Sequence, residues 1–504
     1  MKKSIFFILV FVCFGLQAQN IEDVLRYSFD NTQGTARYQG LSGAFTALGG
    51  DLSAINSNAA SSAVFNNSQF TFTGTNYNRN NDATYYGEFR NGGLNSFKIN
   101  QMGGVFVFKD QSGSSDWKKF TLGLNYDLAS NFRNRAYVSG PSDQGIDNYF
   151  LAFAQGIPLN QLQVGDDEFI EDAYLDIGAN QGFGPQQAFL GFQSGVIDPE
   201  DFDDPNNTAY FGNAIYNRVN QDYYQETSGY NSKFTMNFAT QYLDVLYIGG
   251  SMNFHSIYYE NYTQFSERGY DADSPIGFTN FDNLLVTRGN GFSFNLGMIA
   301  RVNEAIRLGA SYQSPTWYDL TDDFSQRINT DFPDKNTDIT FIDFNIVNLF
   351  PGYSIKTPGK FNGGLALVFG ANGLLSFDYS YQDMSNAELR PTSDPSFATV
   401  NSEIASTLRA VSTFRVGGEY RIKRISLRGG YRYEQSPYVD GFTVGDLNGF
   451  SAGLGFNFGG SRFDITYNWS ERSAEKQLFD VGVTTPARIN AVMNNVGFGY
   501  TLNF

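Results

Sequence analysis

The chain has 504 residues, including 53 glycines, 49 phenylalanines and 31 tyrosines, and its formal net charge is −17. A chain this acidic lacks the basic surface that phosphate binding requires, so we expect no nucleic-acid partner. Aromatic residues make up 16% of the sequence, and their preference for pleated surfaces favours a strand-rich protein.

Residues 1–18 have the pattern of a cleaved signal peptide. Lys2 and Lys3 form a basic start, residues 5–16 form an apolar run, and Ala18 precedes the expected cut. The run is too short for a membrane-spanning helix, which needs about 20 apolar residues. The pattern therefore predicts export from the cytoplasm.

The only cysteine, Cys13, lies inside that apolar run, directly after Val12. A lipoprotein signal has Gly or Ala before its cysteine, so lipid attachment at Cys13 is the less favoured alternative. Cleavage after residue 18 leaves no cysteine in the mature chain. Disulfides are then excluded as a source of stability.

Small residues dominate the segment that follows, above all in "GGDLSAINSNAASSAVF" (49–65). Beyond it, apolar and polar residues alternate at period two. In one example Phe463, Ile465, Tyr467 and Trp469 share a face. This alternation is typical of strands in a membrane β-barrel, where lipid-facing and lumen-facing positions take turns. Fourteen segments carry it: 67–76, 95–108, 118–128, 228–241, 244–262, 288–302, 304–314, 359–370, 373–383, 412–422, 424–435, 447–459, 461–470 and 493–504.

The connections between these segments alternate in length. A few residues join the strands of some pairs, whereas others are separated by long stretches, of which 129–227 is the longest. Short turns on one side and long loops on the other indicate a bacterial outer-membrane barrel. We therefore predict an all-β fold, a 14-stranded antiparallel transmembrane β-barrel over residues 67–504, with an extracellular loop at 129–227.

The last nine residues, "VGFGYTLNF" (496–504), alternate in the same way and end on an aromatic residue. Such an ending resembles the signal that outer-membrane assembly machinery reads, although an ordinary final strand has the same pattern. The location predicted for the chain is the outer membrane, with outer-membrane lipid around the barrel.

Enzyme and cofactor hypotheses find little support. His255 is the only histidine, so a Ser-His hydrolase would depend on it alone, and a structural or lumen-lining role is favoured. The acidic run 198–204 has carboxylates but no glycine for a calcium loop, which favours a solvated loop. We predict no catalytic residue, no metal site and no cofactor.

Arginines on two predicted strands give one set of candidate binding residues. Arg415 and Arg428 alternate with apolar residues, and a charge facing lipid near the midplane costs roughly 2–4 kcal/mol, so both should point inward. One interpretation is an internal salt-bridge network that holds a plug. The other is a site for an anionic head group, because guanidinium binds carboxylate in bidentate fashion.

The long loop gives the other set. Phe150 and Phe153 form one apolar stripe at helical spacing, and Phe169 and Tyr174 belong to another. These stripes either pack against each other or line an apolar groove on the extracellular side. Both can hold at once.

Three stretches together resemble a known family: "GTARYQGLSGAFTALGGDLSAINSNAASSAVF" (34–65), "LGASYQSPTWYDLTDDF" (308–324) and "TPGKFNGGLALVF" (357–369). The first is similar to the N-terminal hatch of the FadL family of long-chain fatty-acid and hydrocarbon transporters. The resemblance implies a hatch at 19–66 inside the barrel. It also implies that a hydrophobic substrate collected at the extracellular loops enters the barrel, is released by a shift of the hatch and leaves sideways through the wall.

One position departs from the family pattern. The family's hatch typically has Asn-Pro-Ala, whereas this chain has Asn58, Ala59 and Ala60. Proline fixes φ and removes a donor, and alanine does neither, which predicts a less rigid hatch turn or the loss of its gating role. Import of fatty acids or hydrocarbons is therefore one hypothesis. The alternatives are a non-transporting accessory subunit that binds other outer-membrane proteins, and an open porin.

Overall fold

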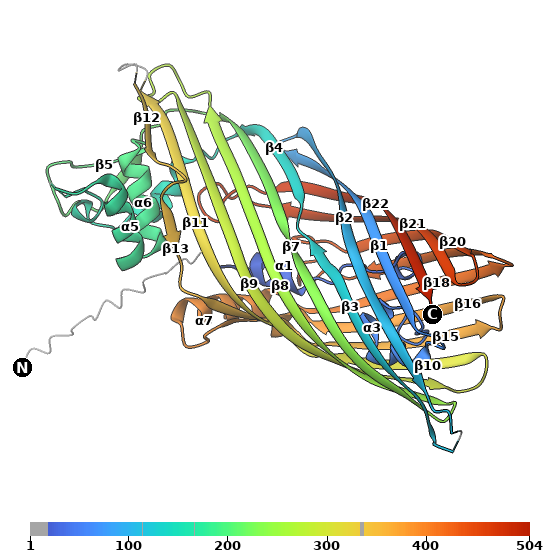
Figure 1. Ribbon diagram of the computed structural model, residues 1–504. Coiled ribbons are helices and arrows are strands. Elements are labelled where there is room, and N and C mark those ends of the chain that lie inside the picture. Colours follow the sequence, from blue (N-terminus) through green and yellow to red (C-terminus); the bar gives the residue numbers. More distant parts are fainter. Residues whose placement is uncertain (1–18, 113, 166, 333–336) are drawn as a thin grey trace, which may run out of the picture.

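The computed structural model describes residues 19–112, 114–165, 167–332 and 337–504, and of residues 332 and 337–341 it describes the backbone alone. The predicted signal peptide, residues 1–18, lies outside the described residues. The described chain forms one closed antiparallel barrel of 14 strands, with helices inside it and at one end (Figure 1). The predicted fold class is confirmed.

Several barrel strands consist of two consecutive segments. β3 and β4 both pair with β7, and β10 and β11 both pair with β9. The segments of the barrel are β1 (Gln69–Tyr85), β2 (Glu88–Lys109), β3 (Trp117–Asn131), β4 (Asn134–Ser142), β7 (Val219–Tyr242), β8 (Leu246–Arg268), β9 (Phe278–Arg301), β10 (Ile306–Gln313), β11 (Trp317–Phe332), β14 (Tyr353–Lys356), β15 (Lys360–Phe369), β16 (Gly373–Asp383), β18 (Ala410–Ile422), β19 (Ile425–Glu434), β20 (Leu447–Asn457), β21 (Ser461–Lys476) and β22 (Ala487–Asn503).

The last strand closes the barrel on the first. β22 pairs with β1 in unbroken register from Asn503 opposite Gln69 to Arg488 opposite Thr84. The C-terminus therefore lies at the end where the connections are short, among them 243–245, 370–372 and 423–424. We call this the short-turn end and the opposite end the long-loop end.

Toward the long-loop end the strands extend further than predicted. β1 and β2 continue through most of 77–94, where a long loop was expected, and a tight turn at Tyr86 and Gly87 joins them. Both turn residues have positive φ, 45° and 84°, as a two-residue hairpin turn of type I′ requires. Likewise β4 and the start of β7 occupy parts of 129–227, which leaves 143–218 outside the wall.

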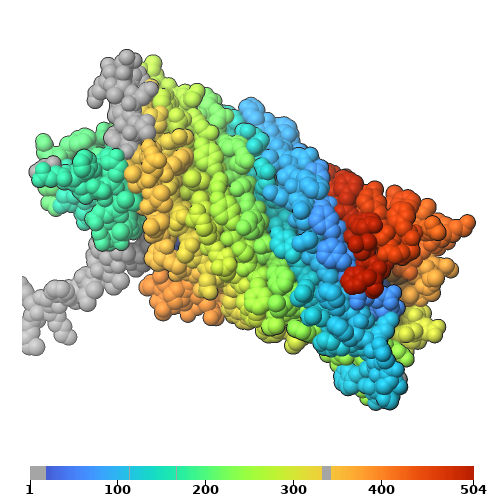
Figure 2. Space-filling model, in the orientation of Figure 1, coloured from blue at the N-terminus to red at the C-terminus, as the bar shows by residue number. Residues whose placement is uncertain are grey.

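The outer face of the barrel is apolar where it meets lipid. Phe120, Phe238, Ile248, Met298 and Leu308 are exposed on it, and they alternate with inward-facing polar residues along their strands. Figure 2 shows the wall that these strands build. In the described part of the chain, no helix is both long and apolar enough to cross a membrane.

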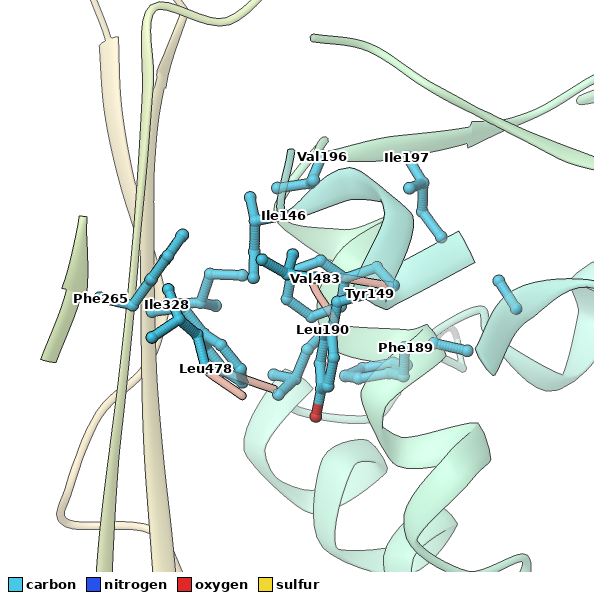
Figure 3. Packing of buried hydrophobic residues seen from close by; sticks show 14 of the residues in the cluster. Ile146, Tyr149, Phe189, Leu190, Val196, Ile197, Phe265, Ile328, Leu478 and Val483 are labelled. Carbon is cyan, nitrogen blue, oxygen red and sulfur yellow. The ribbon is translucent and has the colours of Figure 1, made fainter. Parts of the chain in front are cut away.

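Residues 143–218 form a compact lobe beside the long-loop end (Figures 1 and 2). Its elements are α4 (Asp147–Ala154), η2 (Leu159–Gln161), α5 (Ile170–Asn180), α6 (Phe183–Gln193), β5 (Ile197–Pro199) and β6 (Tyr210–Gly212). A buried apolar cluster joins the lobe to the wall. In it Tyr149 and Leu190 of the lobe pack with Phe265 and Ile328 of the barrel and with Leu478 (Figure 3).

The remaining elements lie in the lumen or at the long-loop end. The lumen holds α1 (Ile21–Ser28), α2 (Ala36–Gln39), α3 (Ala54–Ser57) and η1 (Ala59–Val64). We call residues 19–66 the hatch segment. The others are β12 (Thr337–Ile342), β13 (Val347–Leu349), η4 (Met384–Asn386), β17 (Glu388–Arg390) and α7 (Pro395–Thr407).

Candidate substrate pathway

The hatch segment packs directly against glycines of the wall. A Cβ at Gly297 would lie 2.8 Å from the backbone nitrogen of Ala59, and one at Gly249 would overlap the carbonyl oxygen of the same residue. Side chains on either surface would separate the two backbones. The run of small residues at 49–65 therefore has a structural cause, because the hatch backbone meets the wall without intervening side chains.

The predicted hatch residues lie in this contact. Asn58 is fully buried, and its Nδ2 donates to the carbonyl oxygens of Thr46 at 2.8 Å and Met298 at 2.9 Å. Its Oδ1 accepts from the backbone N–H of Ala60 at 3.0 Å. Ala59 is the first residue of η1, and its carbonyl accepts from the amide of Asn237 at 2.8 Å. Asn58 thus caps η1 and attaches it to β9.

Buried ion pairs attach the hatch segment on the opposite side of the lumen. Arg37 Nε lies 2.9 Å from Glu419 Oε2, and Arg428 Nε lies 2.6 Å from the same oxygen. Arg428 also pairs with Asp464 at 2.7 Å, and its side chain is 1% exposed. Arg428 therefore lies where the salt-bridge interpretation placed it, with its guanidinium bonded to acids of the chain.

Arg415 belongs to a second group of charges around Asp30 of the hatch segment. Arg415 Nη2 and Lys360 Nζ each lie 2.9 Å from Asp30 Oδ2, and Arg432 donates to the backbone carbonyl of Asp30 at 2.7 Å. Burial alone would raise the pKa of Asp30, but these three cations outweigh it and hold the pKa well below its usual range. Asp30 is thus held as a carboxylate between hatch and wall.

Next to this group is a central cavity of about 140 Å³ between residues 27–33 and the wall. Its lining is mostly polar and includes Asp127, Lys233, His255 and Arg415. Polar walls suit a polar or charged group, whereas ligand pockets for apolar molecules are lined mainly by apolar side chains.

His255 connects neighbouring strands at this cavity. Its ring nitrogens lie 3.2 Å from Asn231 Oδ1, 3.3 Å from the hydroxyl oxygen of Tyr318 and 3.4 Å from Ser293 Oγ. The partners come from β7, β11 and β9, and none of these three is a carboxylate. The arrangement corresponds to the lumen-lining role that the sequence favoured.

The wall itself is interrupted between β2 and the β3–β4 strand. Pairing of β2 with β3 ends at Gln101 opposite Asp127, and β2 then continues to Glu88 paired with β1 alone. The β3–β4 strand has a bulge at Ala129, between Leu128 and Ser130, and it is interrupted at residues 132–133, opposite Gly229 of β7. We call the unpaired stretch, between residues 94–100 and 129–134, the window.

Few contacts cross the window. Asn131 Nδ2 donates to Ser96 Oγ at 3.5 Å, the upper limit for a hydrogen bond. Above it, β2 and β4 approach again, because a Cβ at Gly92 would lie 2.9 Å from the carbonyl oxygen of Arg135. The window is therefore a bounded gap in the ladder of the wall.

Cavities lie on both faces of the window. An inner one of about 30 Å³ is lined by Leu94, Ser96 and residues 31 and 33 of the hatch segment. An outer one of about 990 Å³ is lined by Ile99, Leu128 and strands β7, β8 and β9. Asn131 and Arg133 line both. Since residues 31 and 33 also line the central cavity, the three cavities follow one another from the lumen to the outer face.

The four loop residues predicted to bind ligand lie in the lobe. Phe150 is buried against Phe281 of β9, with ring centroids 5.3 Å apart, and Phe153 packs at the edge of the same cluster. Tyr174 is buried, and its hydroxyl donates to Gln326 at 2.8 Å. Phe169 is 75% exposed. Three of the four thus pack within the lobe or against the barrel.

The acidic run 198–204 lies on the lobe, partly within β5. Among the described residues, no group of His, Cys, Asp or Glu side chains has the geometry to hold a metal ion.

The residues of the window were not predicted from the sequence. Asn131 and Arg133 were assigned to a loop, and Ser96 to an ordinary strand. One signal was present: the polar residues that interrupt the alternation after Leu128.

Comparison with known proteins identifies the family. Residues 225–504, more than half of the chain, match the family described as "Outer membrane protein transport protein (OMPP1/FadL/TodX)". No curated protein sequence matches the chain.

Three solved structures have the same fold. The "CymD monoaromatic hydrocarbon channel" is 11% identical, with a TM-score of 0.51 over 94% of this chain and 99% of that one. A Pseudomonas aeruginosa FadL homologue is 13% identical, with a TM-score of 0.50 over 95% and 99%. The P. putida toluene transporter TodX is 13% identical, with a TM-score of 0.51 over 94% and 99%. By the match to its own sequence, the chain belongs to the OMPP1/FadL/TodX family of outer-membrane transport proteins.

Proposed function

We propose that this protein imports hydrophobic small molecules, fatty acids or hydrocarbons, across the outer membrane and releases them sideways through the window. The observation that carries the proposal is the row of three cavities from the lumen to the outer face. Residues 31 and 33 separate the central cavity from the inner one, and Asn131 and Arg133 separate the inner cavity from the outer one. An apolar molecule gains about 25 cal/mol for each Å² it buries. A sideways route keeps it out of bulk water.

The polar lining of the central cavity favours fatty acids within this class. A carboxylate there would lie near Lys233, Lys360 and Arg415, whereas a hydrocarbon would leave these polar groups without hydration. At about 140 Å³ the cavity is smaller than the roughly 300–1,000 Å³ of pockets that enclose drug-sized ligands. Passage of a long chain therefore requires residues 31–33, which lie between the central and inner cavities, to shift.

On the extracellular side, Phe169 is the first contact we propose for a substrate, since it is the most exposed of the four lobe residues. Phe150, Phe153 and Tyr174 would act by keeping the lobe folded beside the barrel. In the lumen, Arg415 would contact the substrate directly, whereas Arg428 would hold Glu419 in place.

Uptake by cells that lack their own transporters tests this function. Cells that produce the native protein should take up a labelled long-chain fatty acid faster than cells with the empty vector. A labelled aromatic hydrocarbon, measured in parallel, separates the two substrate classes. Uptake of neither compound, together with a stoichiometric protein partner in mild detergent, would instead favour the accessory-subunit alternative.

A further inference from the structure

Two cations at the window, Lys98 and Arg133, form no ion pair with the described residues. Neither Lys98 nor Arg133 has an ion pair or a side-chain hydrogen bond with any residue that the structure describes. The Nε of Arg133 is fully buried without a hydrogen-bond acceptor. Both side chains line the outer cavity, and Arg133 also lines the inner one.

This contrasts with the other charges of the outer cavity, which are already bonded. Glu226 pairs with Arg135 at 2.9 Å, and Glu260 accepts from the hydroxyl of Tyr258 at 2.8 Å. Arg327 of the same cavity pairs with Asp282. Of the described charges of this cavity, Lys98, Arg133 and Glu260 therefore remain without an ion pair, and the balance of these three charges is positive.

A guanidinium whose Nε is buried without a partner is costly, since the attraction of a counter-charge must offset its desolvation. The described chain gives ion pairs to Arg327, Arg415 and Arg428 but none to Arg133, whose nearest acid by electrostatic effect, Glu226, is paired with Arg135. Its geometry suits a carboxylate, which can accept two parallel hydrogen bonds from one guanidinium. Lys98 would add a second, point-like cation.

The same cavity also offers an apolar surface. Ile99, Tyr126, Leu128 and Tyr230 line it beside the two cations. A site with a cationic edge and an apolar floor matches a molecule that has a charged head and an acyl tail.

We propose that the window recognises the ionised head group of an anionic amphiphile, a carboxylate on a long acyl chain, and that Arg133 and Lys98 bind it. The inference rests on the proposed function and deepens it, because it makes the wall, and not only the lumen, select the substrate. A neutral chain of equal length would pass without this contact.

The test compares uptake of a labelled C16 fatty acid with that of the matching C16 alcohol. The variants are Arg133→Gln, Lys98→Gln and the conservative Arg133→Lys. Arg90→Gln serves as control, because Arg90 is an exposed arginine of β2 outside the window. Folding of each variant is checked by heat-modifiable electrophoresis, and Lys98→Gln changes only an exposed side chain.

Arg133→Gln should lower the ratio of acid to alcohol uptake roughly tenfold, as expected for the loss of a hydrogen bond between charged groups. Arg133→Lys should restore part of the ratio, Lys98→Gln should lower it less, and Arg90→Gln should not change it. An unchanged ratio in folded Arg133→Gln and Lys98→Gln proteins would overturn the inference, and so would an equal fall in both uptakes.

A second measurement separates this site from transport itself. Purified native protein should bind a fluorescent long-chain fatty acid, and Arg133→Gln should bind it more weakly. Such a difference without any uptake in cells would sustain the site and reject the proposed function. Uptake of the alcohol but not of the acid would sustain import through the barrel and reject the head-group site.

The negative group could also be the phosphate of a resident membrane lipid. Mass spectrometry of lipid retained by native and Arg133→Gln protein in mild detergent distinguishes the two sources. Loss of a phospholipid or lipopolysaccharide from the variant, with the acid-to-alcohol ratio unchanged, would assign the cations to that lipid and overturn the inference.

Discussion

The hatch contact and the window are two parts of one lumen, and they differ in how their polar groups are bonded. In the hatch contact, the side-chain amide of Asn58 both donates and accepts hydrogen bonds. The carboxylate of Glu419 there pairs with both Arg37 and Arg428. At the window, one hydrogen bond of 3.5 Å joins Asn131 to Ser96.

The free energies of these interactions differ between the two regions. Removing one partner of a buried ion pair costs about 3–5 kcal/mol, whereas a single neutral hydrogen bond contributes about 1 kcal/mol. Opening the window therefore costs less than pulling residues 34–65 from the wall. We infer that the hatch segment is a fixed support at Asp30, which Lys360 and Arg415 hold, and from residue 34 onward, and that movement is concentrated at residues 31–33 and the window.

The largest expected effect comes from deleting the hatch segment. Deletion of residues 19–66 should turn the closed barrel into an open channel, because these residues fill its lumen. Planar-bilayer conductance measures this: the native protein should conduct little and the deletion variant strongly. Equal conductance of the two proteins would favour an open porin.

Glu419→Gln weakens the hatch contact but leaves the hatch segment in the chain. The change leaves Arg37 and Arg428 facing a neutral amide and should destabilise the hatch contact by about 3–5 kcal/mol. The unfolding temperature, followed by heat-modifiable electrophoresis, should fall, and channel openings should appear in bilayers. Glu475→Gln, an exposed glutamate of β21, is the matched control and should behave like native protein.

Within the lobe, a buried and an exposed phenylalanine should respond differently. Phe150→Ala removes a fully buried ring and should cost the lobe about 3–5 kcal/mol. Phe169→Ala removes a ring that is 75% exposed and should leave stability within about 0.5 kcal/mol of native. Limited proteolysis of 143–218 reports both. Rapid cleavage of the Phe169 variant would show that this ring also supports the lobe.

The smallest expected effect concerns the alanine at the position of the family's proline. Ala59 is the first residue of η1, a helical position that tolerates proline because its N–H has no partner within the helix. Ala59→Pro should therefore fold and raise stability by about 0.4–1 kcal/mol. A marked loss of stability would mean that the Ala59 N–H or backbone angle is needed in the hatch contact.

Much of the barrel followed from the sequence because alternation is strong where strands face lipid. β18, β19 and β20 begin and end within two residues of the predicted segments. The prediction failed above the membrane. There, strand residues such as "NYNRNNDATY" (76–85) are polar on both faces, so extended pairing leaves no hydropathy signal.

The candidate pathway was predicted only in part. The inward direction of Arg415 and Arg428 followed from the cost of charges in lipid, but their partners are up to hundreds of residues away, as Asp30 is from Arg415. The window was beyond sequence reasoning because it depends on which strands fail to pair. A bulge at Ala129 and an interruption of the strand at residues 132–133 decide that, and neither has an unambiguous sequence pattern.

A reversible cross-link across the window tests the central claim most directly. The mature chain has no cysteine of its own if the signal peptide is cleaved as predicted, so Ser96→Cys with Asn131→Cys would place one pair at the crossing contact. Phe108→Cys with Phe120→Cys, in the paired part of β2 and β3, is the control. Oxidation of the window pair should abolish fatty-acid uptake and reduction should restore it, with the control pair unaffected. Full uptake with the window pair oxidised would contradict release through the wall at this point.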